Sequence, residues 1–316
     1  MAADNCLVAV HSFLAKGVFV DRVLRDKKAI IIFVLPAFAS YLVFMIYPIF
    51  RSLYFSFYEG VPNVNFEFVG FRNFERLGND PIFLNSVNVT VQYVLITASG
   101  LIILGFLAAA LLMFGLRKYT HVARTILYMP VVIPAVGVAA MFSKIYEIQP
   151  NYGLVNSVLV AVGLEQLCKA WAGATSTALA AVCIADIWRS LGYYMVIFYA
   201  GLVNVPKELL EAARIDGANT VQTIRRVVMP IMRPVTVMAI VLCLNNTFKV
   251  YDMPTVLTGG GPGRATYMLS LNMYNMAFSQ WRYGYASVIA VVMMVVTLVV
   301  TQLITYIDAK TESGVV

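Results

Sequence analysis

Long stretches without a charged residue constrain this chain more than any other feature of its sequence. Between Asp80 and Arg117 there is no charge at all, and a helix that spans a bilayer needs about 20 mainly apolar residues. Over the whole chain 60% of the residues are hydrophobic and 12% are charged, whereas soluble domains carry about 25% charged residues. The sequence therefore predicts an all-α integral membrane protein.

Six long apolar stretches, of which the fourth and fifth contain charged residues, predict six transmembrane helices. Pro130 and Pro134 are expected to bend the third, because proline removes a backbone hydrogen-bond donor. We expect one transmembrane domain over residues 29–307, with tails at 1–28 and 308–316. The predicted spans are Ala29–Phe50, Thr90–Leu116, Thr125–Ser143, Ser176–Val203, Val235–Leu257 and Tyr283–Ile307.

The basic residues indicate how the spans are oriented. Of the 23 Lys and Arg residues, fourteen lie in the N-terminal tail, the 117–124 turn, the 204–234 loop and the C-terminal tail. Seven lie in the other three loops. Because Lys and Arg favour cytoplasmic loops, both termini and the 204–234 loop are expected in the cytoplasm. The net charge of +7 is spread over these loops, so it does not predict nucleic-acid binding. The isolated histidines and cysteines predict no metal site.

The loop 204–234 has the pattern of two short helices joined by a glycine. Pro206 suits the start of the first helix, and Gly217 suits the left-handed conformation that ends a helix. Asn219 and Gln222 have the spacing of a capping box at the start of the second. The loop is therefore predicted to fold as helix, glycine elbow and helix outside the membrane.

This loop resembles a cytoplasmic signature of binding-protein-dependent ABC importers. The signature reads EAA, three residues, Gly, nine residues, Ile-x-Leu-Pro. Here Glu211-Ala212-Ala213 precedes Gly217, and Val227, Met229 and Pro230 follow at the same spacing. The phrase FVGFRNFERL in the first outer loop is similar to an element of the same family. The resemblance implies that the loop couples the spans to ATPase subunits through Glu211, Ala212, Ala213, Arg214, Asp216 and Gly217.

A second resemblance, after the fifth span, indicates the carbohydrate branch of this family. Tyr251-Asp252, then Thr258, Gly260-Gly261 and Pro262, is similar to an element of sugar permeases of the maltose and glycerol-phosphate type. The segment 258–266 does not match a nucleotide-binding loop, because Thr258 and Arg264 stand where Gly and Lys are required. ATP hydrolysis is therefore not expected in this chain.

Taken together, the resemblance implies a type I ABC permease in a bacterial cytoplasmic (inner) membrane, importing a sugar or oligosaccharide by alternating access. It implies a heterodimer with a second, related permease and two ATPase subunits that bind ATP and Mg. An extracytoplasmic sugar-binding protein would deliver the substrate. No cofactor is expected in this chain, and its other contacts are membrane lipid.

The candidates for contact with the transported sugar lie in the fifth predicted span, together with two tyrosines of the fourth. Polar groups within spans are costly and often functional. Asn and Thr side chains both donate and accept hydrogen bonds, as sugar hydroxyls require. The alternative is that they join helices to each other, as a Lys249–Asp252 or an Asp186–Arg189 pair would. The candidates are Asn245, Asn246, Thr247, Lys249, Val250, Tyr251, Asp252, Tyr193 and Tyr194.

Other functions fit the sequence less well. A permease for a polyamine or an oxyanion would use the same signature loop, but not the sugar-permease element. A membrane-bound transferase needs a carboxylate cluster for metal and diphosphate, which the sequence lacks. A simple channel would not need the signature loop.

Overall fold

The structure is a computed structural model that describes residues 27–148 and 151–313. Most of the tail predicted at residues 1–28 lies outside this description, as do residues 314–316. The chain forms two compact units, Met1–Phe55 and Ser56–Val316, and each is described by itself.

In the first unit, the described residues form one long apolar helix. The part that is apolar enough to cross a membrane is Ile31–Phe55, 25 residues long, so the helix continues beyond the predicted end at Phe50. Pro36 is accommodated inside it. The helix consists of α2 (Lys27–Tyr41), a π-helical turn (Leu42–Ile46) and α3 (Tyr47–Phe55).

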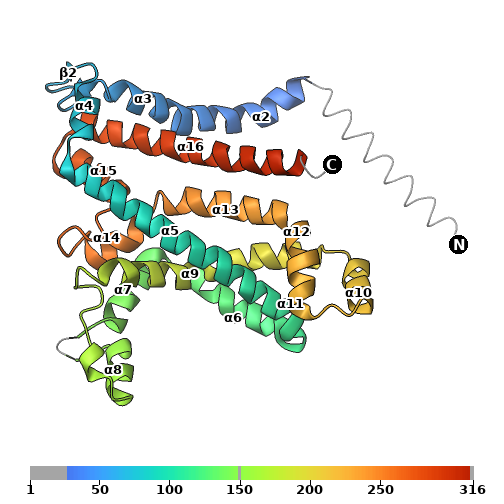
Figure 1. Cartoon of the computed structure of the whole chain (residues 1–316). Helices are drawn as coiled ribbons and strands as arrows, with labels where there is room; N and C mark the ends of the chain where they lie inside the picture. Colours follow the sequence, from blue (N-terminus) through green and yellow to red (C-terminus); the bar gives the residue numbers. More distant parts are fainter. Residues whose placement is uncertain (1–26, 149–150, 314–316) are drawn as a thin grey trace, which may run out of the picture. The chain divides into compact units, whose positions relative to one another are not determined.

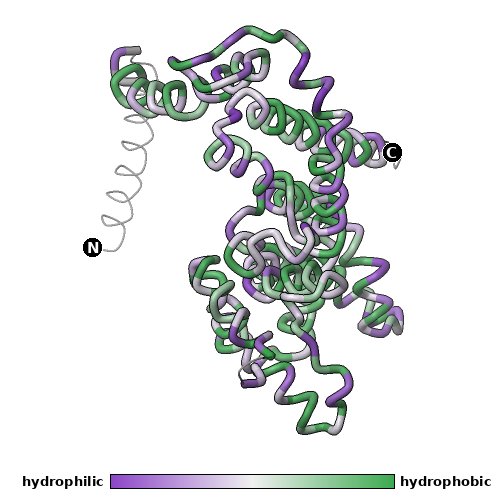
Figure 2. The backbone as a smooth tube through the Cα atoms, turned by 90° about the vertical axis from the view of Figure 1, so that its left-hand side faces the viewer, coloured by the Kyte–Doolittle hydropathy of each residue, from purple (hydrophilic) through white to green (hydrophobic). Residues whose placement is uncertain are grey.

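The second unit is a bundle of long helices (Figure 1). Helices α5 and α9 pack against each other more extensively than any other pair of described elements. Gly105 allows this close approach, since a Cβ atom there would lie 3.0 Å from the Tyr194 Cβ. Hydrophobic residues follow the long helices, and hydrophilic residues gather in the connections (Figure 2). The long helices are α5 (Pro81–Ala110), α6 (Thr120–Val132), α7 (Ala135–Ile145), α9 (Ala178–Val203), α13 (Arg233–Thr247) and α16 (Tyr283–Ser313).

In the described part of the chain, four helices are long and apolar enough to cross a membrane, or up to six if each of two bent pairs is one span. The first bent pair is α6 and α7, which meet at 98°. Pro134 precedes the first residue of α7, which confirms the predicted bend. The second pair is Thr220–Ile231 and α13, bent by 73°. Each of the six predicted spans thus overlaps one of these four helices or one of the two bent pairs.

The fifth predicted span is shorter than expected. The sequence predicted one helix over Val235–Leu257, but α13 ends at Thr247 and a separate helix, α14 (Asp252–Thr258), follows. A backbone carbonyl that leaves a helix loses its helical hydrogen-bond donor and needs another one. Here the Ser270 hydroxyl donates to the Val250 carbonyl. This irregular segment, residues 248–251, lies among residues predicted to contact sugar.

The short elements gather at the two ends of the second unit (Figure 1). At one end, an antiparallel pair of two-residue strands, β1 (Tyr58–Glu59) and β2 (Glu67–Phe68), lies near several short helices. At the opposite end, the signature loop forms three short helices. Those at the first end are α4 (Arg72–Gly78), α8 (Leu154–Ala161), α14 and α15 (Leu269–Tyr274), and those at the opposite end are α10 (Lys207–Ile215), α11 (Thr220–Thr223) and α12 (Met229–Ile231).

Candidate functional site

The signature loop folds as its sequence predicts. Helix α10 starts immediately after Pro206. Gly217 has φ +77°, a conformation that residues with a Cβ rarely adopt, and the amide of Ala218 donates to the Ala213 carbonyl at 2.9 Å. Asn219 and Gln222 form both hydrogen bonds of the capping box, each 2.9 Å long. The helix, glycine elbow and second helix are therefore confirmed as local structure.

One face of α10 packs on the bundle and the other is open. Ala213 is buried, and Leu210 packs against the core cluster that contains Leu202 and Val205. The remaining signature residues, Glu211, Ala212, Arg214, Asp216 and Gly217, are exposed. Beside them two large apolar side chains, Ile215 and Val221, are 86% and 72% exposed. Exposed apolar groups ringed by charges are typical of a protein-docking surface.

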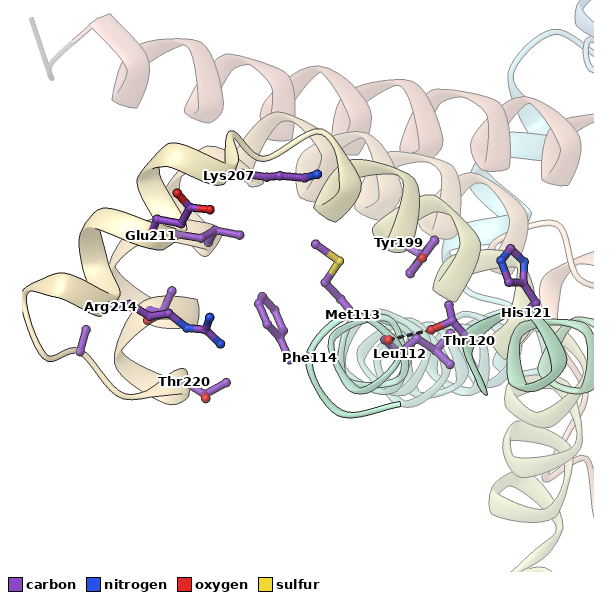
Figure 3. Close-up of a pocket in the computed structure, with 13 residues that line it drawn as sticks. Leu112, Met113, Phe114, Thr120, His121, Tyr199, Lys207, Glu211, Arg214 and Thr220 are labelled. Carbon is purple, nitrogen blue, oxygen red and sulfur yellow. Dashed lines mark hydrogen bonds between the residues drawn. The ribbon is translucent and has the colours of Figure 1, made fainter. Parts of the chain in front are cut away.

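A hollow of about 510 Å³ lies between this segment and the end of the bundle (Figure 3). Lys207, Glu211 and Arg214 line it from α10, and Met113 and Phe114 line it from the π-helical turn that follows α5 (Leu111–Gly115). Within the described residues, neither Glu211 nor Arg214 forms an ion pair. Both charges are thus free to meet charges on another protein.

A second hollow, of about 390 Å³, lies between α9 and the α13–α14 break. It collects eight of the nine residues that the sequence assigned to the sugar path. They come from two separate parts of the chain, helix α9 and the stretch from the end of α13 to the start of α14. They are Tyr193, Tyr194, Asn246, Thr247, Lys249, Val250, Tyr251 and Asp252. Their role in sugar contact remains a prediction.

Asn245, the ninth candidate, does not line this hollow. Its amide donates to the Val241 carbonyl at 2.8 Å and to the Thr301 hydroxyl of α16 at 3.3 Å. It therefore joins α13 to α16, as the helix–helix alternative described. Asn245, Lys249 and Asp252 have the spacing i, i+4, i+7 of one helical face, but they do not share a face because α13 ends at Thr247.

Asp186 and Arg189 form the predicted pair, which is part of the wall of the same hollow. Both Nε and Nη2 of Arg189 donate to Asp186 Oδ1, at 3.1 and 3.0 Å. The Tyr93 hydroxyl donates to Asp186 Oδ2 at 2.6 Å. Asp186 is buried, and three donors compensate the cost of removing its charge from water. The network fixes α5 against α9.

Lys249 and Asp252 line the hollow without an ion pair in the described part of the chain. The alternative Lys249–Asp252 pair is therefore not formed. The Tyr251 phenol can donate and accept a hydrogen bond. The hollow thus offers amide, hydroxyl and aromatic groups together with the paired Asp186 and Arg189 and with Lys249 and Asp252, which are unpaired among the described residues.

Several wall residues were not predicted. Tyr93 contacts Asp186 across 93 positions of sequence, and no local pattern marks this tyrosine. Ser190 and Met253 also line the hollow. Ser190 directly follows Arg189. This position next to a predicted polar residue was the signal in the sequence that could have identified it.

The glycine-rich segment after α14 closes on itself. The hydroxyls of Thr258 and Thr266 lie 2.6 Å apart, and Thr266 also donates to the Gly261 carbonyl at 2.9 Å. Gly260 has φ +84°, and a Cβ there would come within 2.7 Å of Tyr267 and Leu271. This compact turn explains its glycines without a bound phosphate. Within residues 27–148 and 151–313, no group of three or more potential metal ligands occurs.

Comparison with known proteins gives consistent matches. Residues 101–313, more than half of the chain, match the family described as "Binding-protein-dependent transport system inner membrane component". The probable ABC transporter permease protein YurN of Bacillus subtilis (strain 168) is 36% identical over 265 residues, or 83% of this chain and 90% of YurN.

A second relative is the trehalose/maltose transport system permease protein MalF of Thermococcus litoralis. It is 33% identical over 272 residues, which is 85% of this chain and 89% of that protein. Among solved structures, a bacterial ABC transporter involved in the import of the acidic polysaccharide alginate aligns with a TM-score of 0.80 at 21% identity. The alignment covers 92% of this chain and 98% of the other, and at that identity it supports the fold alone.

Proposed function

The chain belongs to the family of inner membrane components of binding-protein-dependent transport systems, and from this premise we propose that it is a permease subunit of an ATP-driven carbohydrate importer. Membership makes it a multi-pass membrane permease component, and its relatives are named as such. The substrate class, the partners and the membrane orientation are the proposed part.

The hollow between α9 and the α13–α14 break is the observation that carries the carbohydrate assignment. Asn246, Ser190 and Tyr251 line it, and each of these groups can donate hydrogen bonds and accept them. A sugar has many hydroxyls and few charges, so such partners suit it better than a ring of like charges would. A relative that is named for trehalose and maltose transport supports the same class.

We propose that substrate passes through this hollow by alternating access. The irregular residues 248–251 place backbone groups at the wall, which is tolerated at membrane depth only where the backbone faces protein or water. Asp186, Arg189 and Tyr93 hold the wall in register while the helices move. The hydrogen-bonding groups would replace part of the water that leaves the sugar as it enters.

The signature loop is the proposed contact with the ATPase subunits, which would bind ATP and Mg. Its exposed Glu211, Arg214 and Asp216 supply charges, and Ile215 and Val221 supply apolar area. A second, related permease would complete a heterodimer, and an extracytoplasmic sugar-binding protein would deliver the substrate. Reversing the charge in Glu211→Lys should lower ATP-driven uptake while the permease stays in the membrane; uptake equal to wild type would remove Glu211 from the contact.

We propose a bacterial cytoplasmic membrane with both termini inside. The signature loop and the glycine-rich turn lie at opposite ends of the second unit (Figure 1), which is consistent with opposite sides of a membrane. In a background without cysteine, Gly263→Cys should react with an impermeant thiol reagent in intact cells, and Thr220→Cys should react only after lysis. The reverse labelling would invert the orientation.

The function itself is tested by reconstituting the complete importer with its own ATPases and binding protein. We expect labelled neutral sugars to enter proteoliposomes only with ATP present. Import of a polyamine or an oxyanion, with no sugar transported, would favour the alternative class of permease. Sugar uptake without ATP would contradict an ATP-driven importer.

A further inference from the structure

A row of five aromatic rings leads away from the hollow between α9 and the α13–α14 break. Helices α14, α15 and the start of α16 lie together at this end of the bundle (Figure 1). The rings follow each other at centroid distances of 5.0, 4.9, 6.3 and 6.2 Å. We refer to this row as the aromatic ladder, and its members in order are Tyr251, Tyr274, Phe278, Tyr283 and Trp281.

The ladder is continuous with the hollow at one end and open at the other. Tyr251 lines the hollow itself. Tyr274 is 42% exposed, and Phe278 and Trp281 are each 58% exposed. These exposed rings form one contiguous row that begins at the hollow, so they offer a continuous aromatic surface to a ligand that approaches it.

The backbone that carries the ladder is held firmly. Asn272 of α15 donates to the Ser86 hydroxyl of α5 at 3.2 Å, and the Leu269 amide donates to the Thr90 hydroxyl at 3.0 Å. Beyond α15 the chain makes a π-helical turn, Asn275–Ser279, that carries Phe278. π-Helical turns within helices are frequently found at functional sites.

Trp281 is held in an unfavourable conformation at the outer end of the ladder. Its φ is +58°, which costs free energy for a bulky side chain. The residues on either side fix it, since the Gln280 amide donates to the Asn275 carbonyl at 2.9 Å and the Arg282 amide donates to the Met276 carbonyl at 2.8 Å. The surrounding structure thus keeps this exposed indole in place against its local preference.

On the premise of the proposed function, we propose that the aromatic ladder is an entry track on which successive pyranose rings of an oligosaccharide stack before they reach the hollow. A pyranose ring has an apolar face of C–H groups and a polar rim of hydroxyls. An aromatic face complements the first and leaves the second in water. Because the rings repeat, the track suits a chain of sugars, and the substrate class is a linear oligosaccharide.

A set of exposed rings also suits an interfacial belt, in which Trp and Tyr sit at lipid headgroups. The two roles differ in their dependence on the sugar. Belt residues would affect every substrate alike, whereas stacked rings would matter more for longer chains. The first outer segment supplies a matched control, since Phe68 is 70% exposed and packs edge-on against Tyr58 at the same end of the bundle but has no ring contact with the ladder.

The test is uptake by the complete importer in proteoliposomes, with its binding protein saturated with labelled glucose, xylose or galactose or with their linear oligomers. Phe278→Ala and Tyr274→Ala should lower oligomer uptake by about two- to tenfold per lost ring and leave monomer uptake near wild type. Tyr274→Phe and Phe278→Tyr, which keep the rings, should restore it. Phe68→Ala should show no dependence on chain length.

Each outcome is decisive. Equal losses for all chain lengths, or losses that Tyr274→Phe does not restore, would overturn the track in favour of a belt or another contact. An importer that takes only monomers, or oligomer uptake unchanged in both alanine variants, would overturn the track while the proposed function stands. Import of no sugar at all would instead refute the proposed function.

Discussion

The signature loop and the hollow between α9 and the α13–α14 break are built in opposite ways. In the loop, the hydrogen bonds that form the elbow and the helix cap join residues close in sequence, such as Asn219 with Gln222 or Ala218 with Ala213. In the hollow, the contacts join distant residues, such as Tyr93 with Asp186 and Ser270 with Val250. The loop exposes its signature charges, whereas the hollow pairs two of its four charged residues, Asp186 and Arg189.

This difference separates two kinds of defect. A change at an exposed residue of the loop should disturb docking and leave the bundle folded, because such a side chain lies outside the core. A change at Asp186, in the wall of the hollow, should reach the fold itself, since this side chain joins two helices. The predictions below, from the largest expected effect to the smallest, test that separation.

The largest loss of stability is expected for Asp186→Ala. It leaves Arg189 and the Tyr93 hydroxyl without their partner in a buried site, which should cost about 3–5 kcal/mol. Thermal unfolding of the purified permease in detergent measures the loss. The matched control is Asp216→Ala in the loop, an exposed carboxylate whose removal should change stability by less than about 0.5 kcal/mol. Equal losses of stability at both positions would contradict the proposed difference between the two regions.

Gly217→Pro should come next, with most ATP-driven uptake lost. The proline ring fixes φ near −65°, whereas the elbow needs +77°, so the second helix would point elsewhere. Membrane insertion and the unfolding temperature should stay close to wild type. Gly217→Asn is the control, because asparagine tolerates the left-handed conformation and should retain uptake. Full transport by the proline variant would show that the elbow is not needed for coupling.

Asn246→Ala should weaken sugar binding by about 1 kcal/mol, because water competes for the hydrogen bond that is lost. Apparent affinity or selectivity among sugars should change, while ATP hydrolysis stimulated by the loaded binding protein persists. Asn246→Leu should act more strongly, since it also fills the hollow. Asn245→Ala is the control, as its side chain contacts α16 instead. If both Asn246 variants transport every sugar normally, this wall does not contact substrate.

The smallest effect is expected for Asn219→Ala in the capping box, about 0.5–1 kcal/mol on the local helix. Hydrogen exchange of residues 220–231 should speed up, with the rest of the bundle unchanged and uptake lowered only modestly. Faster exchange across α9 or α13 would mean that the loop and the core unfold together, which would contradict the separation of the two regions.

The sequence was informative where the physics is local. Capping residues, a glycine at a fixed offset and charge-free runs all act over a few positions, so the two-helix loop, the bend at Pro134 and the number of candidate spans could be predicted. The Asp186–Arg189 pair also follows from a spacing of three on one helix. The fifth span was extended too far, because apolar residues continue from α13 into α14 while the helix does not.

By itself, therefore, the sequence determined that this is a membrane permease with a signature loop of two short helices, since apolarity, caps and motif spacing are properties of short stretches. Only the tertiary structure decided which polar residues share a hollow. The break at residues 248–251 depends on a hydroxyl from α15, Asn245 is turned toward α16, and Tyr93 reaches Asp186 from another helix. Contacts between distant residues have no local signature, because packing of the whole bundle selects them.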